Sequence, residues 1–517
     1  MTKPAPVLRI SHISKRFGTL EANKDISLTL NKGEVLALLG ENGAGKSTLM
    51  AILFGHYVAD EGAIEAFGQP LAPGNPRIAL AAGIGMVHQH FTLADNLTVL
   101  DNVMLGSEPF WLPFSRKRTA RQKFLDVATQ FGLPVNPDAR VGALSVGERQ
   151  RVEILKALYR GARILILDEP TAVLTPQESE SLFETLGQMV AEGLSIIFIS
   201  HKLAEVLRVS TRVAVLRGGK LVAEAAASDV TREQLAQWMV GHGVEMPVRN
   251  PAPPVGADVC VVQNVSATPG KRERLDKVSL TLRGGEIVAI AGVSGNGQAA
   301  LAELLCGMQM ASTGSIKLLG HLLPQLPSLL VQRGVARIPE DRHGVGVVGD
   351  LPVWENALSE RLRSVTFSRF GWIRRRAAQV HARRIIERFD VRGGGPLASA
   401  RSLSGGNMQK LILGRALTAP DGEPAPRLIV AHQPTWGLDV GAVAFVQQQL
   451  IAARDSGAAV LVISDDLDEV MMLGDRVAVM HGGSLTHAAP ANEWTRESIG
   501  LAMAGAHNAA KITGATR

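Results

Sequence analysis

The sequence predicts an α/β protein made of two tandem copies of one domain, each with a mainly parallel sheet at its core. Three observations lead to this prediction. Short apolar runs alternate with helical patterns, a glycine-rich loop stands between one such run and a helix, and the first half of the chain returns in the second. Alternating strands and helices are typical of a parallel sheet covered by helices.

The strands of the first copy are predicted from apolar runs at 33–40, 162–170, 195–200 and 212–219. These runs are short and rich in Ile, Leu and Val, as expected for buried parallel strands. Residues 145–161, "SVGERQRVEILKALYRG", have the apolar spacing of a helix. The same order of elements is expected in the second copy.

The duplication is visible at ordered points along the chain. "KDISLTLNKGEVLALLGENGAGKSTL" at 24–49 returns as "DKVSLTLRGGEIVAIAGVSGNGQAAL" at 276–301, and "ARILILDEPTAVL" at 162–174 returns as "PRLIVAHQPTWGL" at 426–438. Matches in this order indicate duplicated domains rather than a short-period repeat. We expect a first domain over 1–244, a proline-containing linker over 245–258, a second domain over 259–503 and a flexible tail over 504–517.

Composition narrows the class of protein. The 517 residues are enough for several domains, and 46% hydrophobic with 20% charged residues is typical of a soluble globular chain. A net charge of +6 is mild for this length and does not by itself indicate nucleic-acid or lipid binding. No apolar run reaches the roughly 18–20 residues of a membrane span, and the N-terminus lacks the apolar core of a secretion signal. Cys260 and Cys306 form no C-x-x-C pair, so we expect a cytoplasmic protein without a disulfide framework.

The chemistry-bearing loop of the first copy is "GENGAGKS" at 40–47, which satisfies G-x-x-x-x-G-K-[ST] between a predicted strand and helix. Glycines let the backbone wrap closely and aim its amides at phosphate oxygens. Lys46 would bind the β- and γ-phosphates, Ser47 would bind Mg²⁺, and the helix N-terminus favours an anion. A purely structural turn is the alternative, and the strand–loop–helix context favours nucleotide. The candidate binding residues are Gly40, Glu41, Asn42, Gly43, Ala44, Gly45, Lys46, Ser47 and Thr48.

A pair of carboxylates ends the predicted strand "ILILDEP" at 164–170. Asp168 is a candidate Mg²⁺ ligand, and Glu169 is the candidate general base for the attacking water. The alternative is a pair of carboxylates that only caps the next helix.

Together these motifs resemble ATP-binding cassette (ABC) domains, which are P-loop NTPase domains with an added helical subdomain. "LSVGERQR" at 144–151 and "LSGGNMQK" at 403–410 are similar to the signature motif of that family. The resemblance implies that Gln89 contacts Mg²⁺ and senses a transport partner, that His201 contacts the γ-phosphate, and that Phe17 stacks on adenine. The alternatives are a polar loop residue, a core histidine and an ordinary core phenylalanine.

The second copy departs from the motif at the positions that carry chemistry. Gln298 replaces the lysine, Ala299 the Mg²⁺-binding serine, and Asp465 the histidine. A further set of replacements is Glu340 for Gln89, His432 for Asp168 and Gln433 for Glu169. Loss of the lysine removes a charge-assisted contact to phosphate, so hydrolysis there should be negligible.

Intact signature residues nevertheless remain in the second copy, as Ser404, Gly405 and Gly406, whereas Val146 and Glu148 alter the first signature. In the ABC family two domains dock head to tail, and each ATP lies between one phosphate loop and the opposite signature. The resemblance therefore implies one hydrolytic site, with the intact residues of the first copy facing Ser404–Gly406, and one degenerate site. Unselected drift of the second copy is the alternative.

The implied partners are integral membrane permease subunits and, indirectly, a solute-binding protein, with the chain peripheral on the cytoplasmic face of the inner membrane. Fused pairs of this kind resemble the ATPases of bacterial importers, and "GIGMVHQHFTLADNLTVLDNVMLGSEP" at 83–109 is most similar to the nucleoside-importer branch. Trp436 departs from that branch. A monosaccharide importer ATPase is one alternative, and a soluble twin-cassette ATPase acting on the ribosome or DNA is another.

Two stretches mix aromatic residues with Arg and Lys, at 109–123 and 366–379. Their equivalent places in the two copies favour a membrane-proximal face over a solvated helix face or a nucleic-acid surface. We expect no nucleic-acid partner.

Overall fold

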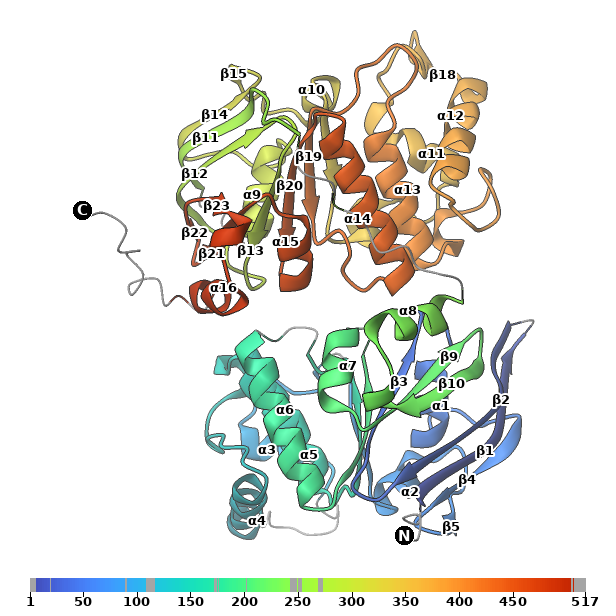
Figure 1. The fold of residues 1–517 in the computed structure, drawn as a ribbon. Helices are drawn as coiled ribbons and strands as arrows, with labels where there is room; N and C mark the ends of the chain where they lie inside the picture. Colours follow the sequence, from blue (N-terminus) through green and yellow to red (C-terminus); the bar gives the residue numbers. More distant parts are fainter. Residues whose placement is uncertain are drawn as a thin grey trace. The chain divides into compact units, whose positions relative to one another are not determined.

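The computed structural model describes residues 6–18, 20–88, 91–107, 117–171, 174, 176–200, 202–241, 249, 253–267, 273–503 and 505. The chain divides into two compact units, Met1–Val244 and Glu245–Arg517 (Figure 1). Each described unit has its own small antiparallel sheet, its own larger and mainly parallel sheet and its own hydrophobic core.

The larger sheet of the first unit has the strand order β10-β9-β3-β8-β7-β6. Its central strand β3 pairs in parallel with β8 on one side and with β9 on the other, and all six of its residues are buried. Burial on both faces explains why this strand is a continuous apolar run rather than an alternating one. The strands of this sheet are β3 (Val35–Gly40), β6 (Ile84–Val87), β7 (Ile164–Asp168), β8 (Ser195–Ile199), β9 (Arg212–Arg217) and β10 (Lys220–Ala226).

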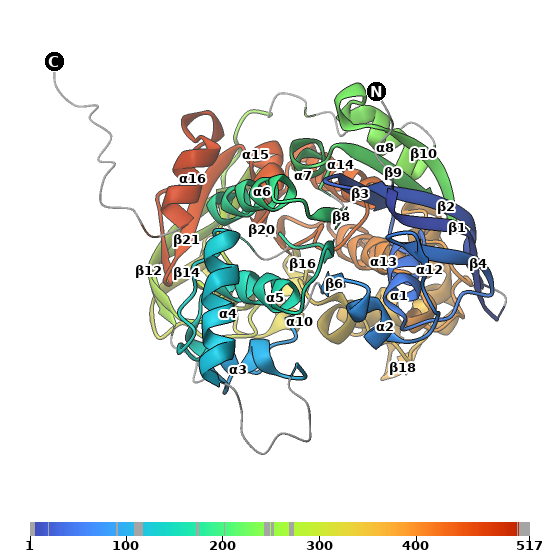
Figure 2. The ribbon, with the colours of Figure 1, turned by 90° about the horizontal axis from the view of Figure 1, so that it is seen from below.

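The smaller sheet of the first unit is antiparallel and has the order β2-β1-β4-β5. Figures 1 and 2 both place this sheet and the helices α3–α5 on opposite sides of the unit. Helix α5 contacts both α3 and α4, and these three helices form the helical subdomain of the unit. The strands are β1 (Pro6–Phe17), β2 (Leu20–Asn31), β4 (Glu61–Ala66) and β5 (Gln69–Pro70). The helices are α1 (Lys46–Phe54), α2 (Pro76–Ala81), α3 (Val99–Met104), α4 (Lys117–Gln130), α5 (Val146–Tyr159), α6 (Pro176–Ala191), α7 (Leu203–Val209) and α8 (Arg232–Val240).

The second unit repeats this architecture. Its larger sheet has the order β16-β19-β20-β13-β21-β22, with β23 also paired to β21, and its smaller sheet has the order β12-β11-β14-β15. Central strand β13 again lies between two parallel neighbours, β20 and β21. The strands are β11 (Asp258–Ala267), β12 (Leu275–Arg283), β13 (Ile287–Ala291), β14 (Thr313–Leu318), β15 (His321–Leu322), β16 (Val335–Ile338), β19 (Leu428–His432), β20 (Ala459–Ser464), β21 (Arg476–His481), β22 (Ser484–Leu485) and β23 (Ala489–Pro490).

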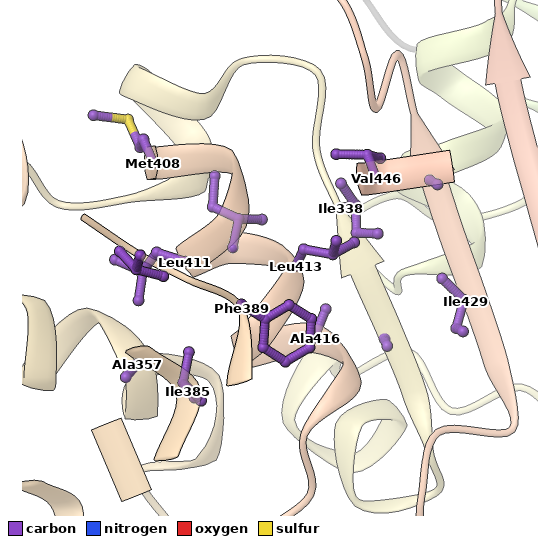
Figure 3. Packing of buried hydrophobic residues seen from close by; sticks show 14 of the residues in the cluster. Ile338, Ala357, Ile385, Phe389, Met408, Leu411, Leu413, Ala416, Ile429 and Val446 are labelled. Atoms are coloured by element: carbon purple, nitrogen blue, oxygen red, sulfur yellow. The ribbon is translucent and has the colours of Figure 1, made fainter. Parts of the chain in front are cut away.

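Close helix packing holds the helical subdomain of the second unit against its sheet (Figure 3). Ile385, Phe389 and Leu413 are fully buried in one cluster that also contains Ile338 of β16. A Cβ atom at Gly414 would lie 2.4 Å from Cγ2 of Ile385, so glycine allows α12 and α13 to approach closely. The helices are α9 (Gln298–Leu305), α10 (Pro327–Gln332), α11 (Val353–Leu358), α12 (Arg375–Arg388), α13 (Gly405–Leu417), α14 (Val440–Asp455), α15 (Leu467–Leu473) and α16 (Arg496–Met503).

The predicted strands and the helix at 145–161 are confirmed as β3, β7, β8, β9 and α5. The elements that were not predicted include the two smaller antiparallel sheets and a short hairpin of β17 (Ser368–Arg369) and β18 (Trp372–Ile373). Among the described residues, no helix has both the length and the apolar character needed to cross a membrane. Most of the predicted linker and tail lies outside the described residues, although Arg249 within the linker donates to Oδ1 of Asp475 in the second unit at 2.5 Å.

Candidate functional site

The glycine-rich loop of the first unit joins β3 to α1, and its backbone demands glycine. Gly43 and Gly45 have φ values of 83° and 100°, in the left-handed region that side chains disfavour. A Cβ atom at Gly40 would lie 2.4 Å from the carbonyl oxygen of Leu216, and one at Gly45 would lie 2.4 Å from that of Ala22. The loop therefore wraps tightly just before the first turn of α1, where backbone amides favour an anion.

Lys46 reaches back across this loop. Its ammonium group donates to the carbonyl oxygens of Gly40 at 2.6 Å and Glu41 at 3.0 Å. These contacts hold a positive charge within the loop, where an incoming phosphate would meet it. Ser47, the next residue of α1, is exposed.

Asp168 is the last residue of β7, Glu169 follows it, and Asp168 lies in the electrostatic field of the same lysine. Burial raises the pKa of Asp168, the neighbouring charge of Glu169 raises it further, and Lys46 lowers it. Glu169 has a φ of 47°, and its backbone amide donates to the carbonyl oxygen of Ile199 at 2.9 Å. A non-glycine residue held in the left-handed region is often found at functional sites. The first unit thus brings Lys46, Asp168 and Glu169 together.

Phe17 lies at the end of β1 with 43% of its surface exposed. Its ring makes an edge contact with Tyr57, at 5.4 Å between centroids, and Nζ of Lys15 lies 5.6 Å from its centroid. An exposed aromatic face of this kind offers a surface on which a base can stack. Gln89 and His201 lie outside the described residues, so their predicted places are not described.

The second unit keeps the backbone conformation of the glycine-rich loop, but different side chains make the hydrogen bonds within it. Gly295 and Gly297 have φ values of 95° and 118°, as in the first loop. Gln298 is buried, its Nε2 donates to the carbonyl oxygen of Val293 at 2.7 Å, and its Oε1 accepts from the amide of Asn296 at 3.0 Å. The side chain of Gln298 therefore hydrogen-bonds to the backbone amide of Asn296 and the backbone carbonyl of Val293 within the loop.

The ionisable side chains near the second loop also differ in charge from those near the first. Burial lowers the pKa of His432 to about 4, which leaves a neutral imidazole where the first unit has Asp168. Burial raises the pKa of Glu340, and the charges of Asp465, Glu273 and Asp341 raise it further. The position equivalent to Lys46 is the neutral Gln298, so this group of acidic side chains disfavours an anionic ligand.

The two signature motifs differ at the N-terminus of the helix that follows each one. Ser145 and Glu148 form a capping box on α5, in which Glu148 Oε2 accepts from the Ser145 amide at 2.8 Å. Hydrogen bonding to Ser145 lowers the pKa of Glu148. Ser404 caps α13 instead with the neutral Asn407, whose Nδ2 donates to Ser404 Oγ at 2.9 Å. The first turn of α13, with Gly405 and Gly406, contains no acidic residue, although Oδ2 of Asp439 would lie 3.7 Å from a Cβ atom at Gly406.

Two residues near these motifs were missed by sequence reasoning. Glu273 hydrogen-bonds to the second glycine-rich loop. Arg342 is buried near the second signature, where its Nη1 would lie 3.4 Å from a Cβ atom at Gly405. The one signal in the sequence was the loss of a cation near Glu273, because Asp276 stands where the first copy has Lys24.

Comparisons with known proteins agree across the whole chain. A family model described as ABC transporter matches residues 23–172 and 275–421. The chain is 42% identical to the nucleoside import ATP-binding protein NupA of Lactococcus lactis, over 96% of this chain and 98% of that protein. It is also 42% identical to the glucose import ATP-binding protein TsgD13 of Haloferax volcanii, over 99% and 98%. Identity to the ribose import ATP-binding protein RbsA of Corynebacterium glutamicum is 36%, over 96% and 93%.

Solved structures that are similar over both units include the complex of archaeal ribosomal stalk protein aP1 with the ribosome recycling factor aABCE1, with a TM-score of 0.61, 17% identity and coverage of 96% of this chain and 92% of that chain. At this identity the likeness concerns the fold alone.

Proposed function

This chain belongs to the ATP-binding proteins of ABC transporters, and we propose that it is the ATP-hydrolysing subunit of an importer for nucleosides or simple sugars. The observation that carries the proposal is the contrast between its two units. The first unit groups Lys46, Asp168 and Glu169, whereas the second has an amide, an imidazole and another amide at the equivalent positions. We therefore assign hydrolysis to the first unit.

The residues of the first unit fit MgATP. The tight glycine turn would aim amides at the phosphates, and Lys46 would neutralise the β- and γ-phosphates. Ser47, Asp168 and Gln89 are the proposed Mg²⁺ ligands, and bound Mg²⁺ would offset negative charge on the phosphates.

Glu169 is the proposed general base. It would accept a proton from the attacking water, while Lys46 stabilises charge developing on the phosphate oxygens. His201 would contact the γ-phosphate, and Phe17 would stack on the adenine ring. Held by the hydrogen bond from its amide to Ile199, Glu169 starts from a fixed backbone.

We also propose that Ser404, Gly405 and Gly406 complete the same site when the two units pair within one chain. Support comes from the distribution of intact elements, since the unit with the intact loop has the altered signature, and the reverse. Ser404 caps its helix with the neutral Asn407, so the first turn of α13 adds no carboxylate at an N-terminus whose dipole favours a γ-phosphate. The opposite combination would place Glu148 against nucleotide phosphates.

The proposed partners are integral permease subunits and, through them, a solute-binding protein, with this chain peripheral on the cytoplasmic face of the membrane. A surface of the second unit supports a membrane-side position. Phe370 and Trp372 in the β17–β18 hairpin are 90% and 81% exposed, and the exposed Arg374, Arg375 and Arg376 follow them. Aromatic rings beside arginines suit the interface of an anionic membrane.

Substitution of Glu169 tests the assignment of hydrolysis. Glu169→Gln keeps the size of the side chain but removes the base, and we expect steady-state hydrolysis to fall by about 10²–10⁴-fold while MgATP still binds. The matched control is Gln433→Ala in the second unit, for which we expect turnover within about twofold of wild type. Near-normal turnover of Glu169→Gln would refute the assignment.

Cross-linking tests the shared site. Cys260 and Cys306 are buried, and burial raises the pKa of both thiols to about 12, so they should react slowly. We expect Asn42→Cys and Ser404→Cys, combined in the Glu169→Gln chain, to be joined by a short bismaleimide in the presence of MgATP. The pair Asn42→Cys with Ser145→Cys is the control and should remain unjoined within one chain.

The choice between nucleoside and sugar is open to direct measurement. The similar proteins include importers named for nucleosides, glucose and ribose, at 36–42% identity. The chain would be reconstituted with its permease and solute-binding protein, and ATP hydrolysis would be measured with guanosine, glucose or ribose added. We expect guanosine to stimulate hydrolysis most, and stimulation by a sugar alone would assign the monosaccharide importer instead.

A further inference from the structure

We propose that the carboxylate of Glu273 takes the place of a phosphate in the second glycine-rich loop, so that the chain binds one nucleotide, at Lys46, and none at Gln298. This inference rests on the proposed function only in that Lys46 marks the nucleotide-binding loop. Glu273 is then the residue that decides which of the two similar loops can bind a ligand.

The hydrogen bonds at the start of α9 carry the inference. Oε2 of Glu273 accepts from the amide of Gly297 at 3.1 Å and from the amide of Ala299 at 3.0 Å. These two amides are equivalent to those of Gly45 and Ser47 in the first unit. Amides of such a loop and helix N-terminus are the groups that bind phosphate oxygens. A single carboxylate oxygen therefore satisfies two donors that a nucleotide would need.

Gln298 closes the rest of the loop. Its Oε1 accepts from the amide of Asn296 at 3.0 Å, which is a third donor turned inward. Its Nε2 donates to Val293 at 2.7 Å, just as Nζ of Lys46 donates to the equivalent Glu41 at 3.0 Å. Gln298 thus reproduces the loop contact of the lysine without its charge, and it uses an amide that the lysine side chain cannot use.

The equivalent carboxylate of the first unit has different partners. Oε1 of Glu21 lies 3.0 Å from Nη2 of Arg16, its Oε2 lies 2.9 Å from Nζ of Lys24, and these hydrogen bonds lower its pKa. In the second copy Asp276 replaces Lys24, so that cation is lost. A carboxylate without this cation gains more from the amides of the loop, which explains why Glu273 has turned to them.

Neighbouring charges also oppose a nucleotide at the second loop. Glu340 lies in the negative field of Asp465, Glu273 and Asp341, which together with burial raises its pKa. A nucleotide di- or triphosphate would bring several more negative charges into this group without a lysine to offset them. Removing the carboxylate of Glu273 would both free two amides and reduce this repulsion.

Glu148 gives an independent parallel within the first unit. Its carboxylate occupies the amide of Ser145 at the altered signature, at 2.8 Å. Both motifs that have lost phosphate-binding residues therefore contain a carboxylate on a backbone amide of the motif. The intact signature at Ser404 has Asn407 at the equivalent position.

Equilibrium binding of radiolabelled MgADP to the full chain tests the proposal in a Lys46→Ala background, which removes binding at the first loop. The second loop is repaired by Gln298→Lys with Ala299→Ser, and this repaired chain is compared with and without Glu273→Ala. We expect the chain with Glu273→Ala to bind at least about tenfold more tightly than the repaired chain that keeps Glu273. Glu21→Ala in the repaired chain is the matched control and should leave MgADP binding unchanged.

Hydrogen exchange supplies a readout that needs no nucleotide. We expect the amides of Gly297 and Ala299 to exchange at least about tenfold faster in Glu273→Ala than in wild type, with the rest of the second unit unchanged. Equal MgADP binding with and without Glu273, or tight MgADP binding to the Lys46→Ala chain alone, would overturn the inference. If the wild-type chain bound no MgADP at the first loop, the proposed function would fail, whereas exchange at Gly297 and Ala299 would still report on Glu273.

Discussion

The two units have the same strand order and similar backbone conformations, but they differ in the chemical groups at equivalent positions. Glu169 and Gln433 follow equivalent strands with φ values of 47° and 48°. Each donates its amide to the end of the adjacent parallel strand, Glu169 to Ile199 at 2.9 Å and Gln433 to Ile463 at 2.8 Å. The unusual backbone conformation is therefore retained after the carboxylate has been lost. The left-handed backbone at this position is a feature of the fold, and under the proposed function only the side chain would take part in the reaction.

The glycine-rich loops also keep their backbone conformation while a side chain differs between the units. In the second unit a Cβ atom at Gly292 would lie 2.4 Å from Nε2 of Gln298 and 2.9 Å from the carbonyl oxygen of Met480. Glycine is needed there to let strand, loop and helix pack, whether or not a phosphate binds. Lysine has no such structural role, because Gln298 makes the equivalent contact to the loop. Substitutions have accumulated where packing permits them.

A further pair of positions shows what the second unit has lost. Glu205 accepts from Thr171 Oγ1 at 2.5 Å, and Nζ of Lys202 lies 3.5 Å from its other oxygen. Its counterpart Glu469 is buried, and Asp466 replaces the lysine. Burial raises the pKa of Glu469 to about 8, and the charges of Asp466 and Asp465 add to the rise. Glu469 thus has no lysine at the position equivalent to Lys202, and hydrogen bonding to Ser464 and Thr435 lowers its pKa only in part.

The largest expected effect separates the two loops. Lys46→Ala removes the cation that lies within the first loop, and we expect ATP hydrolysis to fall by about 10³-fold, equivalent to about 4 kcal/mol. Gln298→Ala is the matched change in the second loop and should alter turnover by less than about twofold. Steady-state phosphate release from the full chain measures both. Equal losses from the two substitutions would show that the units contribute alike, which would break the comparison.

An intermediate effect is expected from Glu469→Gln. The ordinary pKa of the group is 4.5 and its folded pKa is about 8, so the folded state prefers the protonated acid. This contribution to stability is fully present below pH 4.5 and is lost as the pH rises to about 8. The shift corresponds to at most about 5 kcal/mol, and a buried glutamine amide forfeits part of that gain, so we expect a net stabilisation of about 2–3 kcal/mol at pH 9.

Thermal unfolding of the full chain between pH 5 and pH 9 checks this expectation, with the transition of the second unit followed by hydrogen exchange. Glu469→Gln should flatten the fall of stability with pH. Glu205→Gln in the first unit weakens a carboxylate held by Thr171 and Lys202, and it should destabilise the chain by about 1 kcal/mol instead. Stabilisation by both substitutions would contradict the difference drawn between the units.

Much of this comparison was open to sequence reasoning. The apolar runs at 33–40 and 162–170 identified two buried strands, since central parallel strands are apolar on both faces. Alignment of the two copies shows that Gln298 replaces Lys46 and that Gln433 replaces Glu169. These features depend on residues close together in the chain, and local patterns report them well.

The hydrogen bonds within the second loop could not be predicted from the sequence. The hydrogen bonds of Glu273 to Gly297 and Ala299 depend on how the start of β12 passes the start of α9, some 24 to 26 residues away. Glu273 stands two residues before β12, and nothing in the sequence distinguishes it until that close approach is known. The exposed hairpin at β17–β18 was missed for a different reason, since two-residue strands have no measurable periodicity.

The smallest expected effect concerns the aromatic ring that only the first unit offers. Phe17 is 43% exposed and its ring edge contacts Tyr57, which keeps it on the surface rather than in the core. Stacking on a base contributes about 1–3 kcal/mol in favourable cases, and a partly exposed ring should give the lower value. We therefore expect Phe17→Ala to weaken MgATP binding by about five- to tenfold with little change in maximal turnover, whereas Phe17→Trp should bind at least as well as wild type. Titration with a fluorescent ATP analogue measures these affinities, and an unchanged affinity in Phe17→Ala would place the adenine elsewhere.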